Sequence, residues 1–175
     1  MRFGRAWALG TIVCSLAVWM SMPVAAHGAG EPVTVAASAG RFGLVRGGGA
    51  FEAGGEVRFA PWRFRGLPRA WPGISPAAGG MATSRGTLYV YGGFRFDLPI
   101  GSHWRVTPQT AAGFYHRGDG KELGGAIEFR SGLELSRRIG ARSRLGLLFY
   151  HLSNAGIYER NPGTESLVLT YSIGP

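Results

Sequence analysis

Residues 88–98 read Leu-Tyr-Val-Tyr-Gly-Gly-Phe-Arg-Phe-Asp-Leu, and they show an alternating pattern of residue types. The even-numbered positions hold apolar residues or glycine, whereas Tyr89, Tyr91, Arg95 and Asp97 stand at odd-numbered positions. Successive side chains of a β-strand point to opposite faces, so a period of two indicates a strand with one apolar face. The stretch therefore predicts a long strand between an apolar and a polar environment.

The same alternation recurs along the chain and predicts seven further strands. They are expected at residues 33–42, 51–59, 69–77, 104–114, 127–135, 144–154 and 165–173. The strand at 69–77 is the weakest of the eight, because Pro72 and Pro76 interrupt it. We find no internal repeat and no linker in the sequence, so a single domain is expected.

Composition and turn lengths favour a membrane barrel. Only 17% of residues are charged and 12% are aromatic. Connections are expected to be short at 98–102 and 137–143 and longer at 77–86, 116–124 and 155–164, which is typical of small outer-membrane barrels. We therefore expect an all-β fold, an eight-stranded antiparallel transmembrane β-barrel of the outer membrane. The alternative is a soluble secreted barrel with its apolar face inside.

In the membrane barrel the apolar face meets lipid and the charged side chains share the lumen, where opposite charges are expected to pair. The expected lumen charges are Glu52, Glu56, Arg58, Arg95, Asp97, Glu128, Arg130 and Glu134.

The N-terminus predicts export. Two arginines precede a short uncharged apolar run, and small residues end it at Ala26, which is typical of a secretory signal peptide. We expect residues 1–26 to be the signal peptide and residues 27–175 to form the barrel. The cut removes Cys14, the one cysteine, so the barrel is not expected to rely on disulfides.

Motifs for cofactors and nucleic acids are missing from the sequence. The four histidines lack metal-ligand spacing, and there is no nucleotide-binding loop, so no metal and no cofactor are expected. The arginines are scattered, and the net charge, +9 for the whole chain and +7 without Arg2 and Arg5 of the signal peptide, therefore points to anionic lipid headgroups rather than nucleic acid as the partner. The sequence leaves a homodimer open.

One segment carries catalytic residue types at an informative spacing. His151 and Ser153 are two apart, so they share one face of a strand. If the last two strands pair as a hairpin centred near Tyr158, Glu165 lies opposite His151, within hydrogen-bonding reach. Ser153 is then expected near the other ring nitrogen. The hairpin thus predicts a nucleophile, a base and an orienting carboxylate.

These residues share their face with apolar ones. Leu147 and Phe149 precede His151 on that face, and Leu167 and Leu169 follow on the face of Glu165. Polar groups on a lipid-facing surface are expensive unless they serve a function. With the N-terminus in the periplasm, the seventh strand runs outward, which places the site near the outer leaflet.

The residues His151-Leu-Ser-Asn-Ala-Gly-Ile, followed by Asn161-Pro-Gly and Glu165, closely resemble the signature of the PagL family, the outer-membrane lipid A 3-O-deacylases. The resemblance implies hydrolysis of the ester at position 3 of lipid A in lipopolysaccharide, with release of a 3-hydroxy fatty acid and without a metal. It identifies Ser153, His151 and Glu165 as the triad. It further implies that Asn154 and Gly156 stabilise the oxyanion.

Two other functions are weighed against this one. A structural or adhesive barrel without chemistry would not need the triad residues. An outer-membrane phospholipase would need calcium ligands, and the sequence offers no such cluster.

Overall fold

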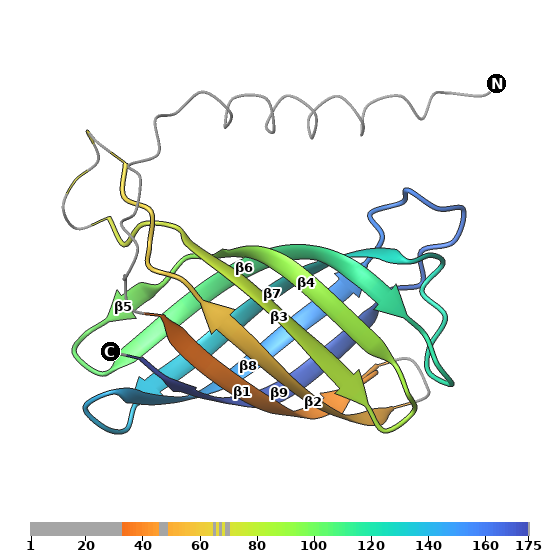
Figure 1. The fold of residues 1–175 in the computed structure, drawn as a ribbon, viewed down its shortest axis with the longest axis horizontal. Coiled ribbons are helices and arrows are strands. Elements are labelled where there is room, and N and C mark those ends of the chain that lie inside the picture. Colours follow the sequence, from red (N-terminus) through yellow and green to blue (C-terminus); the bar gives the residue numbers. More distant parts are fainter. Residues whose placement is uncertain (1–32, 46–48, 65, 67, 69–70, 175) are drawn as a thin grey trace.

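The computed structural model describes residues 33–45, 49–64, 66, 68 and 71–174, and these form an all-β fold (Figure 1). The predicted signal peptide, residues 1–26, lies outside the described residues. The described strands are β1 (Thr34–Phe42), β2 (Ala50–Arg58), β3 (Ser75–Thr83), β4 (Leu88–Arg95), β5 (Leu98–Ile100), β6 (Trp104–His116), β7 (Ile127–Arg138), β8 (Ser143–Ser153) and β9 (Thr164–Ile173). Within the described part of the chain, no helix has the length and apolar character needed to cross a membrane.

All neighbouring strands pair antiparallel, and the sheet closes on itself. The order is β4-β3-β2-β1-β9-β8-β7-β6-β5, and an additional pairing joins β4 to β6. β4 ends its ladder where Arg95 faces Gln109, and β5 resumes it where Leu98 faces Val106, so both lie along β6 as one interrupted barrel strand. The predicted eight-stranded antiparallel barrel is confirmed.

The strand predicted at residues 69–77 is wrong. The strand is β3, which begins at Ser75 and extends to Thr83, into what was expected to be a loop. Its sequence, SPAAGGMAT, has few large apolar residues, so its alternation is hard to recognise. The small residues have a packing reason, because a Cβ atom on Gly79 would lie 2.8 Å from the Tyr91 hydroxyl.

The long connection expected at 77–86 is also wrong, because β3 occupies residues 75–83 and leaves only a short turn before β4, whereas the other four expected connections agree with the structure. We call the end where β1 starts and β9 finishes the proximal end, and the opposite end the distal end. The longest connection, between β2 and β3, is proximal, and the short turn between β3 and β4 is distal. In Figure 1 the proximal end carries the C label and the distal end carries the blue loop between β8 and β9.

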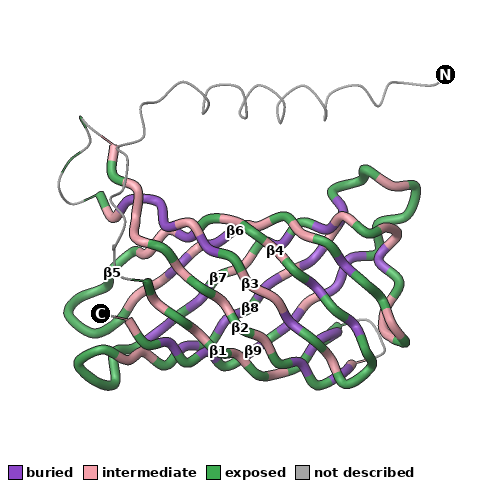
Figure 2. Tube along the Cα trace, viewed as in Figure 1, coloured by how far each residue is buried: buried purple, intermediate pink, exposed green. Residues whose placement is uncertain are grey.

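The faces of the strands are as the alternation predicted, with exposed and buried residues alternating along the wall (Figure 2). The outward face carries many exposed large apolar side chains, including Phe51, Val90, Phe94, Phe114, Leu133, Leu147, Phe149, Leu167 and Leu169. Such a face suits lipid contact. The structure therefore favours the membrane barrel over the soluble alternative, in which the apolar face would be inside.

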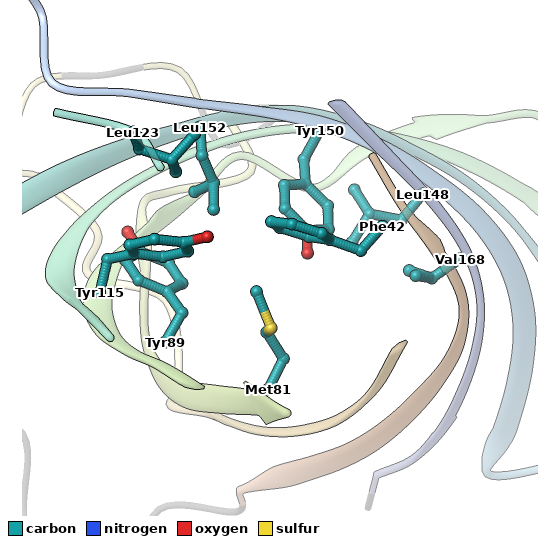
Figure 3. Packing of buried hydrophobic residues seen from close by; sticks show 9 residues of the cluster. All are labelled: Phe42, Met81, Tyr89, Tyr115, Leu123, Leu148, Tyr150, Leu152 and Val168. Carbon is teal, nitrogen blue, oxygen red and sulfur yellow. The ribbon is translucent and has the colours of Figure 1, made fainter. Parts of the chain in front are cut away.

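The lumen is filled in two different ways. Its distal half holds an aromatic and aliphatic cluster, shown in Figure 3, of Phe42, Met81, Tyr89, Tyr115, Leu123, Leu148, Tyr150, Leu152 and Val168. The cluster lies behind the distal ends of β8 and β9. The inward face is thus not simply polar, because apolar side chains fill this half of the interior.

Further towards the proximal end the lumen holds an ion-pair network. Glu134 accepts from Arg95 at 2.7 Å and from Arg58 at 3.2 Å, and Arg58 and Arg95 also contact Glu56. The pairing expected of lumen charges is confirmed for these residues. Glu128 is an exception, because neither of its carboxylate oxygens has a hydrogen-bond partner among the described residues.

Candidate active site

His151 and Glu165 lie side by side on the outward wall near the distal end. The register of β8 and β9 places them directly opposite each other, as the hairpin predicted. The Nδ1 atom of His151 lies 3.3 Å from Oε1 of Glu165. Both side chains are partly exposed, at 38% and 24%, so a substrate on the wall can reach the imidazole.

Ser153 stands at the distal end of β8, two residues beyond His151 and on the same face. The neighbouring strand places Phe129 directly opposite Ser153. Ser153 and His151 share no hydrogen bond in the described structure. The structure therefore brings the base and the carboxylate together and places Ser153 two residues further along the same face, without the expected bond to the imidazole.

Buried residues fix the backbone on which these side chains stand. Leu152, between His151 and Ser153, is fully buried and belongs to the lumen cluster. Asn154, the next residue, is also fully buried. Because alternate residues are anchored inside, the outward positions of His151 and Ser153 are held by the barrel interior.

The side chain of Asn154 organises the loop that follows β8. Its Nδ2 atom donates to the carbonyl oxygens of Leu123 at 2.9 Å and Arg160 at 2.7 Å, and its Oδ1 atom accepts from the Gly156 amide at 3.0 Å. The Asn154 amide in turn donates to Asn161 Oδ1 at 3.1 Å. The two side-chain hydrogens of Asn154 and the Gly156 N–H are thus used within the loops.

Two distal loops pack against each other beside the site. The β6–β7 loop contributes Gly124 and Gly125, where a Cβ atom would meet the Arg160 carbonyl and the Tyr158 ring respectively. The Tyr158 hydroxyl also accepts from the Ile127 amide at 3.1 Å. The loop after Ser153 is therefore braced by its neighbour over much of its length.

Gly163 forms the back of the imidazole site, and sequence reasoning missed this role. Its φ angle is +57°, and a Cβ atom there would lie 2.7 Å from His151 Cε1 and 3.0 Å from Nε2. Left-handed backbone favours glycine, and here the missing side chain also makes room for the ring. The turn sequence Asn161-Pro162-Gly163 was visible, but the contact with His151 depends on the pairing of β8 and β9.

No metal cluster accompanies these residues. The described part of the chain contains no group of three or more His, Cys, Asp or Glu side chains that could hold a metal ion. A cavity of about 560 Å³, lined by Arg58, Arg105, Arg138, Arg144 and other residues, lies at the proximal end, away from His151.

The protein is thus a closed, eight-stranded transmembrane β-barrel of the outer-membrane kind, with a histidine–carboxylate pair on its outward wall. The family model for lipid A 3-O-deacylase (PagL) matches residues 49–174. The chain belongs to the PagL family.

A curated relative supports this assignment over a shorter stretch. The lipid A deacylase PagL of Bordetella bronchiseptica is 40% identical over 52 residues, which are 30% of this chain and 29% of the relative. The match thus spans less than a third of the relative's length.

Solved structures agree on the fold. The crystal structure of the outer membrane enzyme PagL matches with a TM-score of 0.61 at 19% identity, covering 80% of this chain and 98% of that one. Neisserial surface protein A matches with a TM-score of 0.55 at 11% identity, covering 84% and 99%. The similarity of two such different proteins shows the barrel fold and leaves activity to the site.

Proposed function

We propose that this protein is a lipid A 3-O-deacylase, which hydrolyses the ester-linked acyl chain at position 3 of lipid A by a Ser153–His151–Glu165 triad. The observation that carries the proposal is the contact of His151 Nδ1 with Glu165 Oε1 on the outward wall, in a chain of the PagL family. A histidine–carboxylate pair on a lipid-facing surface is costly unless it has a function.

The contact to Glu165 fixes what each ring nitrogen does. Glu165 Oε1 lies 3.3 Å from Nδ1 and favours the tautomer that carries its proton there, so a neutral His151 presents an unprotonated Nε2 as a base. Ser153 Oγ attacks the ester carbonyl carbon while Nε2 takes the hydroxyl proton. Glu165 keeps the imidazole in this tautomer and stabilises its charged form.

Collapse of the tetrahedral intermediate then completes the first half of the reaction. The carbon–oxygen bond to the sugar breaks, and Nε2 gives its proton to the leaving sugar oxygen. Water next attacks the acylated Ser153 with His151 again as the base, and the fatty acid leaves. Residues and water supply each proton transfer, so this mechanism needs no cofactor.

The oxyanion needs hydrogen-bond donors, and by resemblance these are Asn154 and the Gly156 amide. Both lie within three residues after Ser153 in the chain, which supports the assignment. In the structure their donors are bonded to Leu123, Arg160 and Asn154 itself. They would serve the oxyanion only if the loop after β8 exchanged these bonds when substrate binds.

We place the barrel in the outer membrane with its distal end outward, after removal of residues 1–26 as a signal peptide. The lipid-facing position of His151 and Glu165 near the distal end supports this orientation, because lipid A forms the outer leaflet. Lipopolysaccharide is then both the surrounding lipid and the substrate.

The test is mass spectrometry of lipid A from cells that express the wild-type protein, the Ser153→Ala variant or neither. Wild type should yield lipid A that lacks one ester-linked acyl chain, assigned to position 3 by fragmentation. Unchanged lipid A in the presence of folded wild-type barrel would contradict the proposal. Loss of a chain from glycerophospholipids alone would instead support a phospholipase.

A further inference from the structure

A row of polar side chains crosses four neighbouring strands of the outward wall. The register pairs Thr110 of β6 with Ser131 of β7, Ser131 with His151 of β8, and His151 with Glu165 of β9. Thr110 and Ser131 are exposed, and the residues on either side of Ser131 in sequence are less exposed. Opposed side chains on one face have Cβ atoms about 4.5–5.5 Å apart, so the row is continuous.

The rows on both sides are largely apolar. On the proximal side the equivalent positions are Pro108, Leu133, Phe149 and Leu167. On the distal side they are Ala112, Phe129 and Ser153. Apart from the nucleophile itself, the polar row is thus flanked by side chains that suit lipid.

The row also runs from the rim into the lipid-facing wall. Measured along the strands, Glu165 lies 1 residue from the distal end of β9, Ser131 lies 4 residues from that of β7, and Thr110 lies 6 residues from that of β6. An acyl chain bound to a site at the rim would extend in the same direction, into the hydrocarbon.

Neither of the two hydroxyls has a partner in the protein. Ser131 and Thr110 make no side-chain hydrogen bond within the described part of the chain. In contrast, Ser143 and Tyr171 share a hydrogen bond of 3.2 Å on the same wall near the proximal end. Unpaired polar groups in hydrocarbon are unfavourable, so Ser131 beside His151 and Thr110 on the next strand point to a polar group on the substrate.

We propose that Ser131 and Thr110 form a polar subsite for the acyl chain, and that Ser131 selects ester-linked chains carrying a hydroxyl close to the ester carbonyl. The inference rests on the proposed function, because it takes Ser153 as the nucleophile. A hydroxyl two or three carbons from the carbonyl at Ser153 would lie about one strand spacing away, roughly 4.8 Å. Ser131 pairs with His151 and lies diagonally from Ser153, about 7–8 Å away, a distance that such a hydroxyl and one hydrogen bond to Ser131 Oγ can span.

Selection follows from the hydrogen bond that only the hydroxylated chain can make. A substrate hydroxyl pairs with Ser131 Oγ, whereas a plain methylene leaves both Ser131 and Thr110 unpaired in lipid. One such hydrogen bond corresponds to a preference of about 3- to 10-fold in kcat/KM.

The experiment is an internal competition with purified full-length barrel in detergent micelles. Two synthetic 3-O-acylated glucosamine lipids of equal chain length are mixed, one with a 3-hydroxyacyl chain and one with the plain acyl chain. Mass spectrometry of the released fatty acids gives the kcat/KM ratio. The variants are Ser131→Ala, Thr110→Val and Ser131→Thr, and Ser143→Ala is the matched control on the same wall.

The wild type and Ser143→Ala should prefer the hydroxylated chain by about 3- to 10-fold. Ser131→Ala should abolish this preference without slowing release of the plain chain, Thr110→Val should reduce it, and Ser131→Thr should retain it. Equal release of both chains by wild type, or an equal loss on both chains in Ser131→Ala, would overturn the subsite. Release of neither chain by folded wild type would overturn the proposed function itself.

Discussion

The imidazole of His151 and the carboxylate of Glu165 meet at 3.3 Å from opposed positions of β8 and β9, on the side of the barrel that faces away from its lumen. Their contact follows from strand register alone, since no loop has to carry either residue into place. A rigid hairpin of this kind fixes the orientation of a catalytic base more firmly than a loop does.

We expect Ser153→Ala and His151→Ala to lower the rate of deacylation by about a thousandfold or more, because each removes a group that transfers the proton or forms the acyl bond. Neither side chain fills the lumen, so both variants should fold. Lipid A mass spectrometry measures the activity, and the heat-modifiable mobility of the barrel on electrophoresis reports folding. Full activity of folded Ser153→Ala would exclude Ser153 as the nucleophile.

We expect the Asn154→Ala variant to destabilise the loop after β8. The substitution leaves the carbonyls of Leu123 and Arg160 without their donor, at a cost of about 1–3 kcal/mol. Trypsin should then cut after Arg160 faster than in wild type, while cleavage after Arg142, in the proximal turn, stays the same. Activity should fall because the loop follows the nucleophile directly.

The same variant separates two roles of Asn154. If the side chain acts only on the oxyanion, the tryptic rate at Arg160 will not change while kcat falls. If it holds the loop, both will change together.

The sequence predicts those features of the fold that are set within a single strand. Features of the fold that depend on packing between paired strands were not predictable from it. Alternation predicted seven strands to within a few residues, because large side chains on the lipid face repeat with period two. The bounds of β3 were not predicted, because its small residues give no clear alternation. These residues leave space for Tyr91, and that space is required only when β3 and β4 are paired.

The site divides in the same way. The contact between His151 and Glu165 was predictable because a hairpin has a simple pairing rule. Three other features were not predictable from the sequence: the loop hydrogen bonds of Asn154, the contact of Gly163 with His151 and the position of Ser131. Each depends on the register or packing of segments outside the signature. A hydroxyl at an otherwise apolar strand position was the one sequence signal that Ser131 offered.

Arg160 is expected to contribute to substrate binding. Arg160 is exposed in the loop beside the site, whereas the exposed Arg117 side chain is paired with Glu122 at 3.1 Å. Arg160→Ala should raise KM about two- to fivefold on phosphorylated lipid A with little change in kcat, because a headgroup contact exists in both ground and transition states. Arg117→Ala should have a smaller effect.

Steady-state assays at two salt concentrations check this prediction, with Arg142→Ala at the opposite end as the control. A contribution from charge should shrink at high salt. An unchanged KM for Arg160→Ala at low salt would show that its charge does not contact the substrate.

Glu134 should be important for stability. It is buried and accepts from Arg95, Arg58 and Thr170, so Glu134→Ala removes one carboxylate from two buried guanidinium groups, which must then share Glu56. The expected loss is about 3–5 kcal/mol in the free energy of unfolding. Urea-induced unfolding in detergent measures it, and Glu122→Ala, which breaks an exposed pair, should cost less than about 1 kcal/mol.

Gly163 provides the sharpest test of how the imidazole is held. In Gly163→Ala the new Cβ atom would lie 2.7 Å from His151 Cε1, closer than carbon atoms pack, so the ring must turn away. That movement would lengthen its contact with Glu165 and misdirect Nε2, and we expect kcat to fall at least tenfold with little change in KM.

Backbone strain alone could also weaken the variant, and Gly86→Ala is the matched control. Gly86 has a φ angle of +71° in a turn at the same distal end, and a Cβ atom there would have no neighbour within 4 Å. Both variants should lose a similar amount of stability, about 1–2 kcal/mol, from the left-handed backbone. Only Gly163→Ala should lose activity; equal activities of the two variants would show that the His151 ring does not depend on this space.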